Sequence, residues 1–448
     1  MRQSHQLPLM GLLLFSLIPR QQCEICEVSK ENYTALNPLI STMINSKYNK
    51  GIQAANVLLS LRLGGFLSQS QDQQLTEKVL LATRSTEPSL TSGQLALAIL
   101  ALGACKGPDG IPKTSELVID LENKFQAEIK NMEEHDGNPL TNYYQLSLDV
   151  LALCLFSGKY SIPEVAEIFK PGNKNYYFHE QFSVDTGAMA VLALTCVKEK
   201  ITRRQNQTDS KYADNIVNHT RSLVNEILSQ KTENGLLGNI YSTGEAMQAL
   251  FVSPTYYNEN QWDCQKTRDR VLAEISQGAF RMPTAAAQIL PALMGKTYLD
   301  VNKDSSCVYG SDSFNISTQE PVSVTPAVSP SEIEVYYSVV INNQIDNTTV
   351  SVPNGSVFLD VMEQAEKENA TRFSFTAEES SWGPYITSVQ GIKANTNDRT
   401  YWELLSNGKP LSQGKRESAK KPHRVTMPQT PRCECVSFRG ECAKALGN

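Results

Sequence analysis

Three acidic residues are the first candidates for chemistry in this 448-residue chain, and they are Asp149, Asp185 and Glu245. Two carboxyl groups placed across a glycosidic bond can hydrolyse it, one as an acid and the other as a base or nucleophile. The position of Asp185, however, is typical of a helix cap, and Asp149 and Glu245 are equally suited to bind a ligand by hydrogen bonds. Glycoside hydrolysis by Asp149 and Asp185 is therefore kept as the alternative to a binding function.

The other common catalytic patterns are missing from the sequence. Its five histidines show no paired metal-ligand spacing. No glycine-rich phosphate loop, nucleophile elbow or Cys/His nucleophile pair stands out. The net charge of −6 offers no surface that neutralises phosphates, so nucleic-acid binding is excluded as the main activity. We therefore expect a protein that is not an enzyme, uses no catalytic cofactor and holds no metal with its own side chains.

A short polar group followed by an Ala/Leu-rich segment recurs at intervals of about 40 to 55 residues. Each clear copy begins with Ser, Thr, Asn or Asp, whose side-chain oxygen can cap a helix. Each continues with little charge on any side, which predicts a helix that is buried all round. The clear copies span residues 91–105, 141–154, 183–196, 242–251 and 284–295, and a weaker copy spans 54–65.

More polar segments lie between these copies, such as residues 115–135 and 215–230. Their apolar residues recur at three and four positions, which predicts outer amphipathic helices. Such helix pairs form either an open solenoid or a closed ring, and we favour a closed α/α ring. Because every inner helix then starts at the same end, eight polar residues converge on one mouth: Gln94, Thr141, Tyr144, Gln145, Asp185, Asn239, Ser242 and Gln288.

The character of the sequence changes after Cys307. Residues 311–332 are rich in Ser, Thr and Pro without any period, which predicts a flexible linker. Residues 333–414 alternate as strands around one short helix and predict a small α+β or β domain. The mouth contains amides and hydroxyls and few charges, which favours a large neutral ligand. Two domains joined by a flexible linker could hold such a ligand between them. Four aromatic residues of the second domain can cover such a ligand: Trp382, Tyr385, Tyr401 and Trp402.

The amino-terminal segment indicates export. Residues 7–18 are apolar, follow Arg2, and are too short to cross a bilayer, which needs about 20 apolar residues. This pattern predicts a secretory signal at residues 1–23 and a secreted protein without a membrane span. Cysteines pair in an oxidising compartment, and six of them allow 15 pairings: Cys26, Cys105, Cys154, Cys196, Cys264 and Cys307. Seven sequons predict N-glycosylation at Asn32, Asn206, Asn218, Asn315, Asn347, Asn354 and Asn369.

These segments resemble the extracellular cobalamin carriers, the family of haptocorrin, intrinsic factor and transcobalamin, and the haptocorrin branch most. The resemblance covers residues 1 to about 414 and lies in SGQLALAILALGAC, PLTNYYQLSLDVLALC, FSVDTGAMAVLALTC, GNIYSTGEAMQALF, AAAQILPALMGKTYLD and SWGPYITSVQG. It implies a mainly α protein with an α6/α6 barrel at residues 24–310, the linker at 311–332 and a β domain at 333–414 that caps a corrinoid. It also implies the bridges Cys26–Cys264, Cys105–Cys307 and Cys154–Cys196.

The resemblance further implies which residues contact cobalamin. In the barrel these are Thr141, Tyr144, Gln145, Asp185, Asn239, Ser242 and Gln288, and in the β domain Trp382, Gly383, Trp402, Glu403 and Leu404. The implied function is that of a secreted transport protein that sequesters cobalamin and corrinoid analogues between its domains. A cell-surface receptor is a further expected partner, and the carrier is expected to be a monomer.

The sequence differs from members of the family at one residue and in its tail. Where transcobalamin has a histidine able to reach the cobalt, this chain has Phe182, so no protein ligand for cobalt and a broad acceptance of corrinoids are expected. Residues 415–448 form an atypical tail without a strand period. The sheet of the second domain is therefore expected to lack its closing strand and to expose an unpaired edge. A secreted glycoprotein that binds no ligand is the second alternative.

Overall fold

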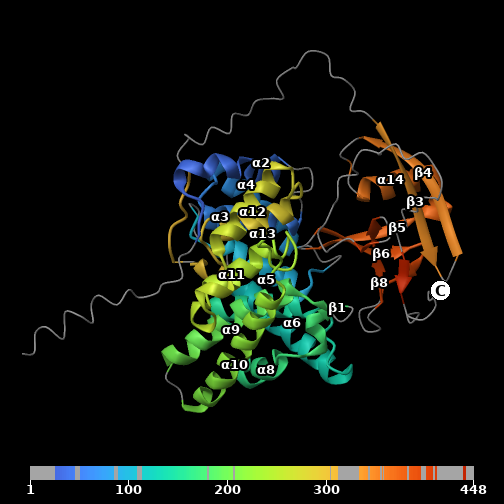
Figure 1. The fold of residues 1–448 in the computed structure, drawn as a ribbon. Helices are drawn as coiled ribbons and strands as arrows, with labels where there is room; N and C mark the ends of the chain where they lie inside the picture. Colours follow the sequence, from blue (N-terminus) through green and yellow to red (C-terminus); the bar gives the residue numbers. More distant parts are fainter. Residues whose placement is uncertain are drawn as a thin grey trace, which may run out of the picture.

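The computed structural model divides into a helical part and a smaller part rich in strands (Figure 1). Among the described residues, no helix is both long and apolar enough to cross a membrane. The predicted signal segment 1–23 lies outside the described residues, and so does the predicted linker 311–332 except for Glu332, which begins a strand. The structure describes residues 26–45, 51–84, 89–107, 114–178, 181–204, 207–302, 304–310, 332–341, 344–353, 356, 358–380, 383–394, 400–406, 409–410 and 437–439.

Six inner helices of the described chain form a closed ring, because each contacts the next and the last contacts the first. Their residues are almost all buried, as the low charge of the repeated segments predicts. The weak copy at 54–65 is the first member of the ring, which confirms the closed α/α arrangement. In ring order the inner helices are α3 (Gln53–Gly64), α5 (Ser92–Leu102), α7 (Tyr143–Leu155), α9 (Val184–Arg204), α11 (Thr243–Phe251) and α13 (Pro283–Leu293).

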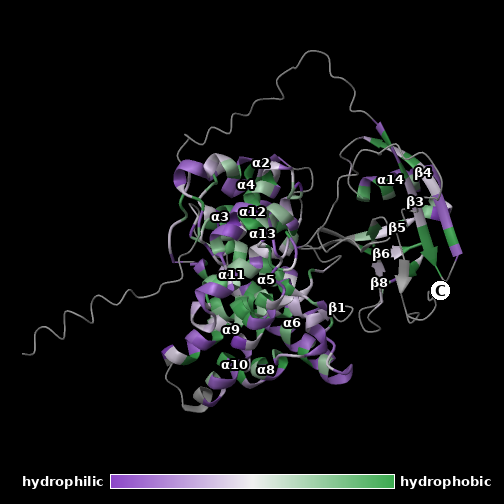
Figure 2. Cartoon of the chain, in the orientation of Figure 1, coloured by the Kyte–Doolittle hydropathy of each residue, from purple (hydrophilic) through white to green (hydrophobic). Residues whose placement is uncertain are grey.

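Each inner helix is preceded in the chain by an outer helix, which gives the α6/α6 order. The outer helices contact the ring, for example α4 against α3 and α5, and α6 against α5 and α7. Figure 2 shows the inner helix α5 as mainly hydrophobic, whereas α4 and α12 carry many hydrophilic residues. The outer helices are α2 (Asn37–Asn45), α4 (Gln69–Thr83), α6 (Thr114–Glu134), α8 (Ile162–Ile168), α10 (Gln207–Ser229) and α12 (Cys264–Ser276).

The helix starts agree with the predicted caps at some positions and differ at others. The Thr91 hydroxyl accepts from the backbone N–H of Gln94 at 3.2 Å, as expected of a cap. The prediction that Asp185 caps its helix is wrong, because α9 already begins at Val184 and the Ser183 hydroxyl accepts from the first turn. The last inner helix likewise begins at Pro283, whose fixed backbone angle suits a first helical position, rather than at a capping threonine.

Three disulfides fasten the ring, and they are the three that the family resemblance implies. Cys154–Cys196 joins the neighbouring inner helices α7 and α9. Cys105–Cys307 joins the residues after α5 to the end of the helical part. Cys26–Cys264 joins the segment before the first helix to the start of α12, across a sequence separation of 238 residues.

The strand-rich part has its own hydrophobic core, which includes Tyr337, Val350, Met362, Phe373 and Trp402. One sheet has the order β4-β3-β11-β8 and a second has the order β5-β6-β7. The elements are β3 (Glu332–Ile341), β4 (Gln344–Pro353), α14 (Phe358–Glu368), α15 (Ala370–Phe373), β5 (Phe375–Ser380), β6 (Gly383–Val389), β7 (Ile392–Lys393), β8 (Tyr401–Glu403), β9 (Leu405–Ser406), β10 (Lys409–Pro410) and β11 (Ser437–Arg439).

The tail contributes a strand that the sequence did not predict. Residues of β11 pair in parallel with β3 and antiparallel with β8, so that Phe438 lies opposite Trp402. The expectation that this sheet loses its closing strand is therefore wrong. Three residues are too few to show the alternation that identifies a strand, and the pairing uses backbone groups that every residue except proline carries in full.

Candidate functional site

The ring brings the predicted mouth residues to the N-terminal ends of the inner helices, where two side-chain hydrogen bonds join different helices. Thr91, which precedes α5, donates its hydroxyl to Oε1 of Gln145 in α7 at 2.6 Å. Tyr144 of α7 donates its hydroxyl to Oε1 of Glu245 in α11, also at 2.6 Å. Because α9 lies between α7 and α11 in the ring, the second bond reaches past a neighbouring helix.

Thr141 is fixed from the outer layer of helices. Its backbone N–H donates to Oε2 of Glu128 in α6 at 3.0 Å. The other oxygen of Glu128 accepts from the hydroxyl of Ser92 in α5 at 2.8 Å. Glu128 is buried, so one carboxylate joins two helices to the loop that carries Thr141. Oγ1 of Thr141 has no hydrogen-bond partner among the residues that the structure describes.

The segment before α11 is a tight turn held by Asn239 and Ser242. Oδ1 of Asn239 accepts from the backbone N–H of Tyr241 at 2.8 Å and of Ser242 at 3.1 Å. The Ser242 hydroxyl accepts from the Asn239 N–H at 2.8 Å and donates to the carbonyl oxygen of Leu237 at 2.8 Å. Both predicted residues therefore shape the mouth through the backbone.

Asp185 and Glu245 lie in the first turns of α9 and α11, and both are buried. Burial raises the pKa of the Asp185 carboxyl to about 7. Burial, and secondly the nearby Asp185, raise the pKa of the Glu245 carboxyl well above its usual range. Oδ1 of Asp185 and Oε2 of Glu245 have no hydrogen-bond partner in the described part of the chain. Because buried polar atoms are nearly always hydrogen-bonded, these atoms are suited to bind a polar ligand.

Gln94 lies in the first turn of α5, and Gln288 lies in the second turn of α13. Oε1 of Gln94 accepts from the backbone N–H of Thr91 at 2.9 Å and so completes a capping box. Gln288 is buried in α13, and its backbone carbonyl lies beside Gly244 of α11. The predicted polar residues of the ring thus share one end of it, from α5 through α13.

Asp149 belongs to a different cluster. It is fully buried, and burial, then the charge of Glu128, raise the pKa of its carboxyl well above the usual range. The charged groups that act on Asp149 are Glu128 and Lys124, which belong to the outer helix α6, whereas Asp185 acts on Glu245.

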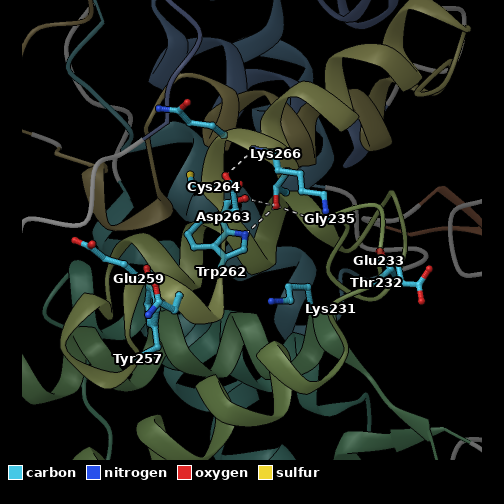
Figure 3. A pocket seen from close by; sticks show the side chains of 13 residues that line it. Lys231, Thr232, Glu233, Gly235, Tyr257, Glu259, Trp262, Asp263, Cys264 and Lys266 are labelled. Carbon is cyan, nitrogen blue, oxygen red and sulfur yellow. Dashed lines mark hydrogen bonds between the residues drawn. The ribbon is translucent and has the colours of Figure 1, made fainter.

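A pocket of about 760 Å³ lies elsewhere on the helical part, and none of the predicted ligand-binding residues lines it (Figure 3). It is lined by residues of two segments, 231–235 and 257–267. Several of its polar groups already bond to one another: Nε1 of Trp262 donates to the Thr267 hydroxyl at 2.8 Å, and this hydroxyl donates to the carbonyl of Gly235 at 2.6 Å. Among the described residues, the buried oxygens without a hydrogen-bond partner include those of Thr141, Asp185 and Glu245 at the mouth, and none belongs to a residue that lines this pocket.

The structure describes only some of the predicted ligand-binding residues of the second domain. Trp402 is buried in the core of the strand-rich part, and its Nε1 donates to the carbonyl of Ile392 at 3.0 Å. Leu404 is half-buried beside it, Glu403 ends β8 and Gly383 begins β6. Trp382 lies outside the described residues. Trp402 thus packs into the core of the strand-rich part, and its predicted contact with a ligand stays a prediction.

The class of protein now follows from this ring and from the comparisons with known proteins. Residues 8–328 match the family model described as eukaryotic cobalamin-binding protein. Residues 355–419 match a second model, a domain of unknown function called DUF4430. The first match spans well over half of the chain, and we conclude that the chain belongs to the family of eukaryotic cobalamin-binding proteins.

Individual relatives agree with this assignment. The chain is 63% identical to human transcobalamin-1 over 415 residues, which cover 92% of this chain and 96% of that protein. It is 35% identical to human cobalamin binding intrinsic factor over 400 residues, which cover 87% and 89% of the two chains. Among solved structures it is similar to haptocorrin in complex with Cbi, with a TM-score of 0.77 and 55% identity over 93% of this chain and 99% of that one.

Two features of the mouth were missed by sequence reasoning. One is the pairing of Glu245 with Tyr144, which depends on closure of the ring and has no signature in either segment. The other is the close approach of helix starts at Gly93 and Gly244, where an added Cβ atom would lie 2.5 Å from Cβ of Gln145 and 2.7 Å from the carbonyl oxygen of Gln288. The recurrence of Ser/Thr-Gly at the start of several copies was the available signal for these approaches.

Proposed function

We propose that this chain is a secreted carrier that binds cobalamin and related corrinoids at the mouth of its α6/α6 ring. The single observation that carries the proposal is the set of buried, unpartnered oxygens at this end, on Thr141, Asp185 and Glu245. Hydroxyl and carboxyl groups suit a corrinoid, whose rim bears carboxamides that both donate and accept hydrogen bonds. Membership of the cobalamin-binding family and the likeness to haptocorrin in complex with Cbi support the same ligand.

The contacts proposed for the ligand are those of the sequence motifs. They comprise Thr141, Tyr144, Gln145, Asp185, Asn239, Ser242 and Gln288 from the ring, with Trp382, Gly383, Trp402, Glu403 and Leu404 from the second domain. The second domain, residues 333–414, would cover the ligand. The function is binding and transport, and the relatives named above are carriers rather than enzymes.

Binding is proposed to depend little on the nucleotide part of the ligand. Phe182 packs its ring near Tyr176 and Tyr177, and an aromatic ring supplies no ligand atom for cobalt. The binding affinity then comes from hydrogen bonds to the groups around the corrin ring. In competition for the purified protein, cobinamide, which lacks the nucleotide, should displace hydroxocobalamin at comparable concentration. A requirement for a large excess of cobinamide would contradict this part of the proposal.

Secretion, glycosylation and a monomeric state complete the proposal. The four sequon asparagines in the described chain, Asn32, Asn218, Asn347 and Asn369, are all exposed, which glycan transfer requires. A cell-surface receptor is the further proposed partner. Recovery of the glycosylated protein from the medium of expressing cells, with a monomeric mass by light scattering, is the expected result. Retention of unglycosylated chain inside the cells would contradict it.

A further inference from the structure

Glu245 lies where the site residues of three inner helices meet. It is 1% exposed, and its Oε1 accepts the hydroxyl hydrogen of Tyr144 at 2.6 Å. Its Oε2 has no partner among the described residues, and neither has Oδ1 of the neighbouring Asp185. The two carboxyls stand in the first turns of α11 and α9, where the positive end of each helix dipole faces them.

The groups around Glu245 come from every side of the mouth. The ionisable ones are Asp185 of α9, Tyr144 of α7 and Tyr298, which begins the short helix η5 (Tyr298–Asp300). The neutral amide of Gln248, one turn along α11, accepts from the Tyr298 backbone N–H at 3.0 Å. Within the described chain no lysine, arginine or histidine is among the groups that act electrostatically on Glu245.

Two buried carboxyls without a cation between them cannot both be charged at low cost. Their mutual repulsion favours a state in which one of the two carboxyls keeps its proton, as in paired carboxyls of other proteins. The raised pKa of each carboxyl agrees with this arrangement. A pair with one proton offers both a donor and an acceptor, which is the complement of a carboxamide.

We propose that Glu245 is a positioning and specificity residue of the site: it fixes the Tyr144 hydroxyl and shares one proton with Asp185, so that the pair recognises a carboxamide group of the ligand. This inference rests on the proposed corrinoid-binding function and deepens it. Ligand affinity is then highest where the pair holds one proton. It falls at higher pH as the donor is lost, and at lower pH as the acceptor is lost.

The test compares hydroxocobalamin dissociation from the full chain across the pH range with dissociation from Glu245→Gln, measured by visible absorption against an excess of cobinamide. The glutamine amide keeps an acceptor for Tyr144 and a permanent donor. The wild-type protein should release ligand faster on the alkaline side, and Glu245→Gln should lose this dependence. Asp149→Asn removes a different buried carboxyl and should keep the wild-type profile. An alkaline limb unchanged in Glu245→Gln would overturn the proposal.

Glu245→Leu tests the positioning role separately. Loss of the acceptor for the Tyr144 hydroxyl should speed dissociation about tenfold, the usual effect of one buried hydrogen bond, at every pH. Tyr144→Phe should have a smaller effect in the Glu245→Leu background than in the wild type, because the bond between the two residues is already gone. Independent, additive effects would overturn the positioning role, and if Glu245→Leu does not fold the pH profile of Glu245→Gln still decides. Failure of the wild-type protein to bind any corrinoid would instead count against the proposed function.

Discussion

At the scale of single residues, the mouth is held by side chains of different inner helices, as where the Tyr144 hydroxyl of α7 donates to Glu245 of α11. Tyr144, Gln145 and Asp185 could be assigned to one end of the ring because each follows closely on a helix start. The role of Asp185 as a cap was wrong, since Ser183 precedes it and accepts from the first turn instead. Which side chains bond to one another depends on the distances across the ring, and a sequence pattern contains no such distances.

The raised pKa of Asp185 predicts how the stability of the ligand-free protein changes with pH. The folded pKa of about 7 exceeds the ordinary value of 3.8, so the folded state keeps a proton that the unfolded chain releases. This contribution to stability is complete below about pH 3.8 and is lost as pH rises through about 7.

Calorimetry should therefore show that the melting temperature of the wild-type protein falls between pH 5 and pH 8, relative to that of Asp185→Asn. Asparagine cannot bind or release this proton in either the folded or the unfolded state. The variant is therefore the control for the wild-type protein at each pH. If the melting temperatures of the two proteins change with pH in the same way across this range, the raised pKa of Asp185 is contradicted.

At the scale of elements, all six inner helices and most strands were foreseen, because their patterns are long. The β11 strand was not, because its three residues lie in a segment without alternation. The spacing between inner helices was also not foreseen. It depends on Gly93 and Gly244, whose missing side chains let the start of α5 approach the start of α7, and the start of α11 approach the middle of α13.

Gly93→Ala should separate α5 from α7. Its Cβ atom would lie 2.5 Å from Cβ and 2.8 Å from Cα of Gln145, and neither atom can move without the helix. We expect a loss of about 1 to 3 kcal/mol in the free energy of unfolding, larger than the gain in helix propensity of about 1 kcal/mol. Denaturant unfolding measures the first effect, and weaker corrinoid retention should accompany it because Gln145 is displaced. Unchanged or increased stability would show that the ring tolerates a wider spacing.

At the scale of the whole molecule, the ring is closed by contacts between α13 and α3 and is fastened by Cys26–Cys264. The resemblance to known carriers predicted this bridge, whereas the cysteine count alone left 15 pairings open. Replacing both cysteines with serine should lower the free energy of unfolding by about 5 kcal/mol in the chain-entropy account, because the bridge closes a long loop.

The matched replacement of Cys154 and Cys196, which close a loop of 42 residues, should cost about 4 kcal/mol. Denaturant unfolding of both variants under non-reducing conditions provides the comparison. A smaller loss for the longer loop would show that the bridges do not act mainly on the unfolded chain.

At this scale the tail also contributes a strand to the fold of the strand-rich part. Its β11 strand lies between β3 and β8, opposite Trp402. Truncation after Gly414 should therefore expose unpaired backbone groups on β3 and β8 and weaken ligand retention. Full retention by the truncated chain would show that this pairing is dispensable.

The central claim, that the ring binds a corrinoid, is tested most directly by the visible absorption spectrum of the secreted full-length protein. The protein is incubated with hydroxocobalamin and desalted, and the corrinoid retained per chain is measured. A companion protein carries a hairpin like that of the family in place of residues 415–448. The account predicts close to one corrinoid per full-length chain. Absence of retained corrinoid in both proteins would contradict it.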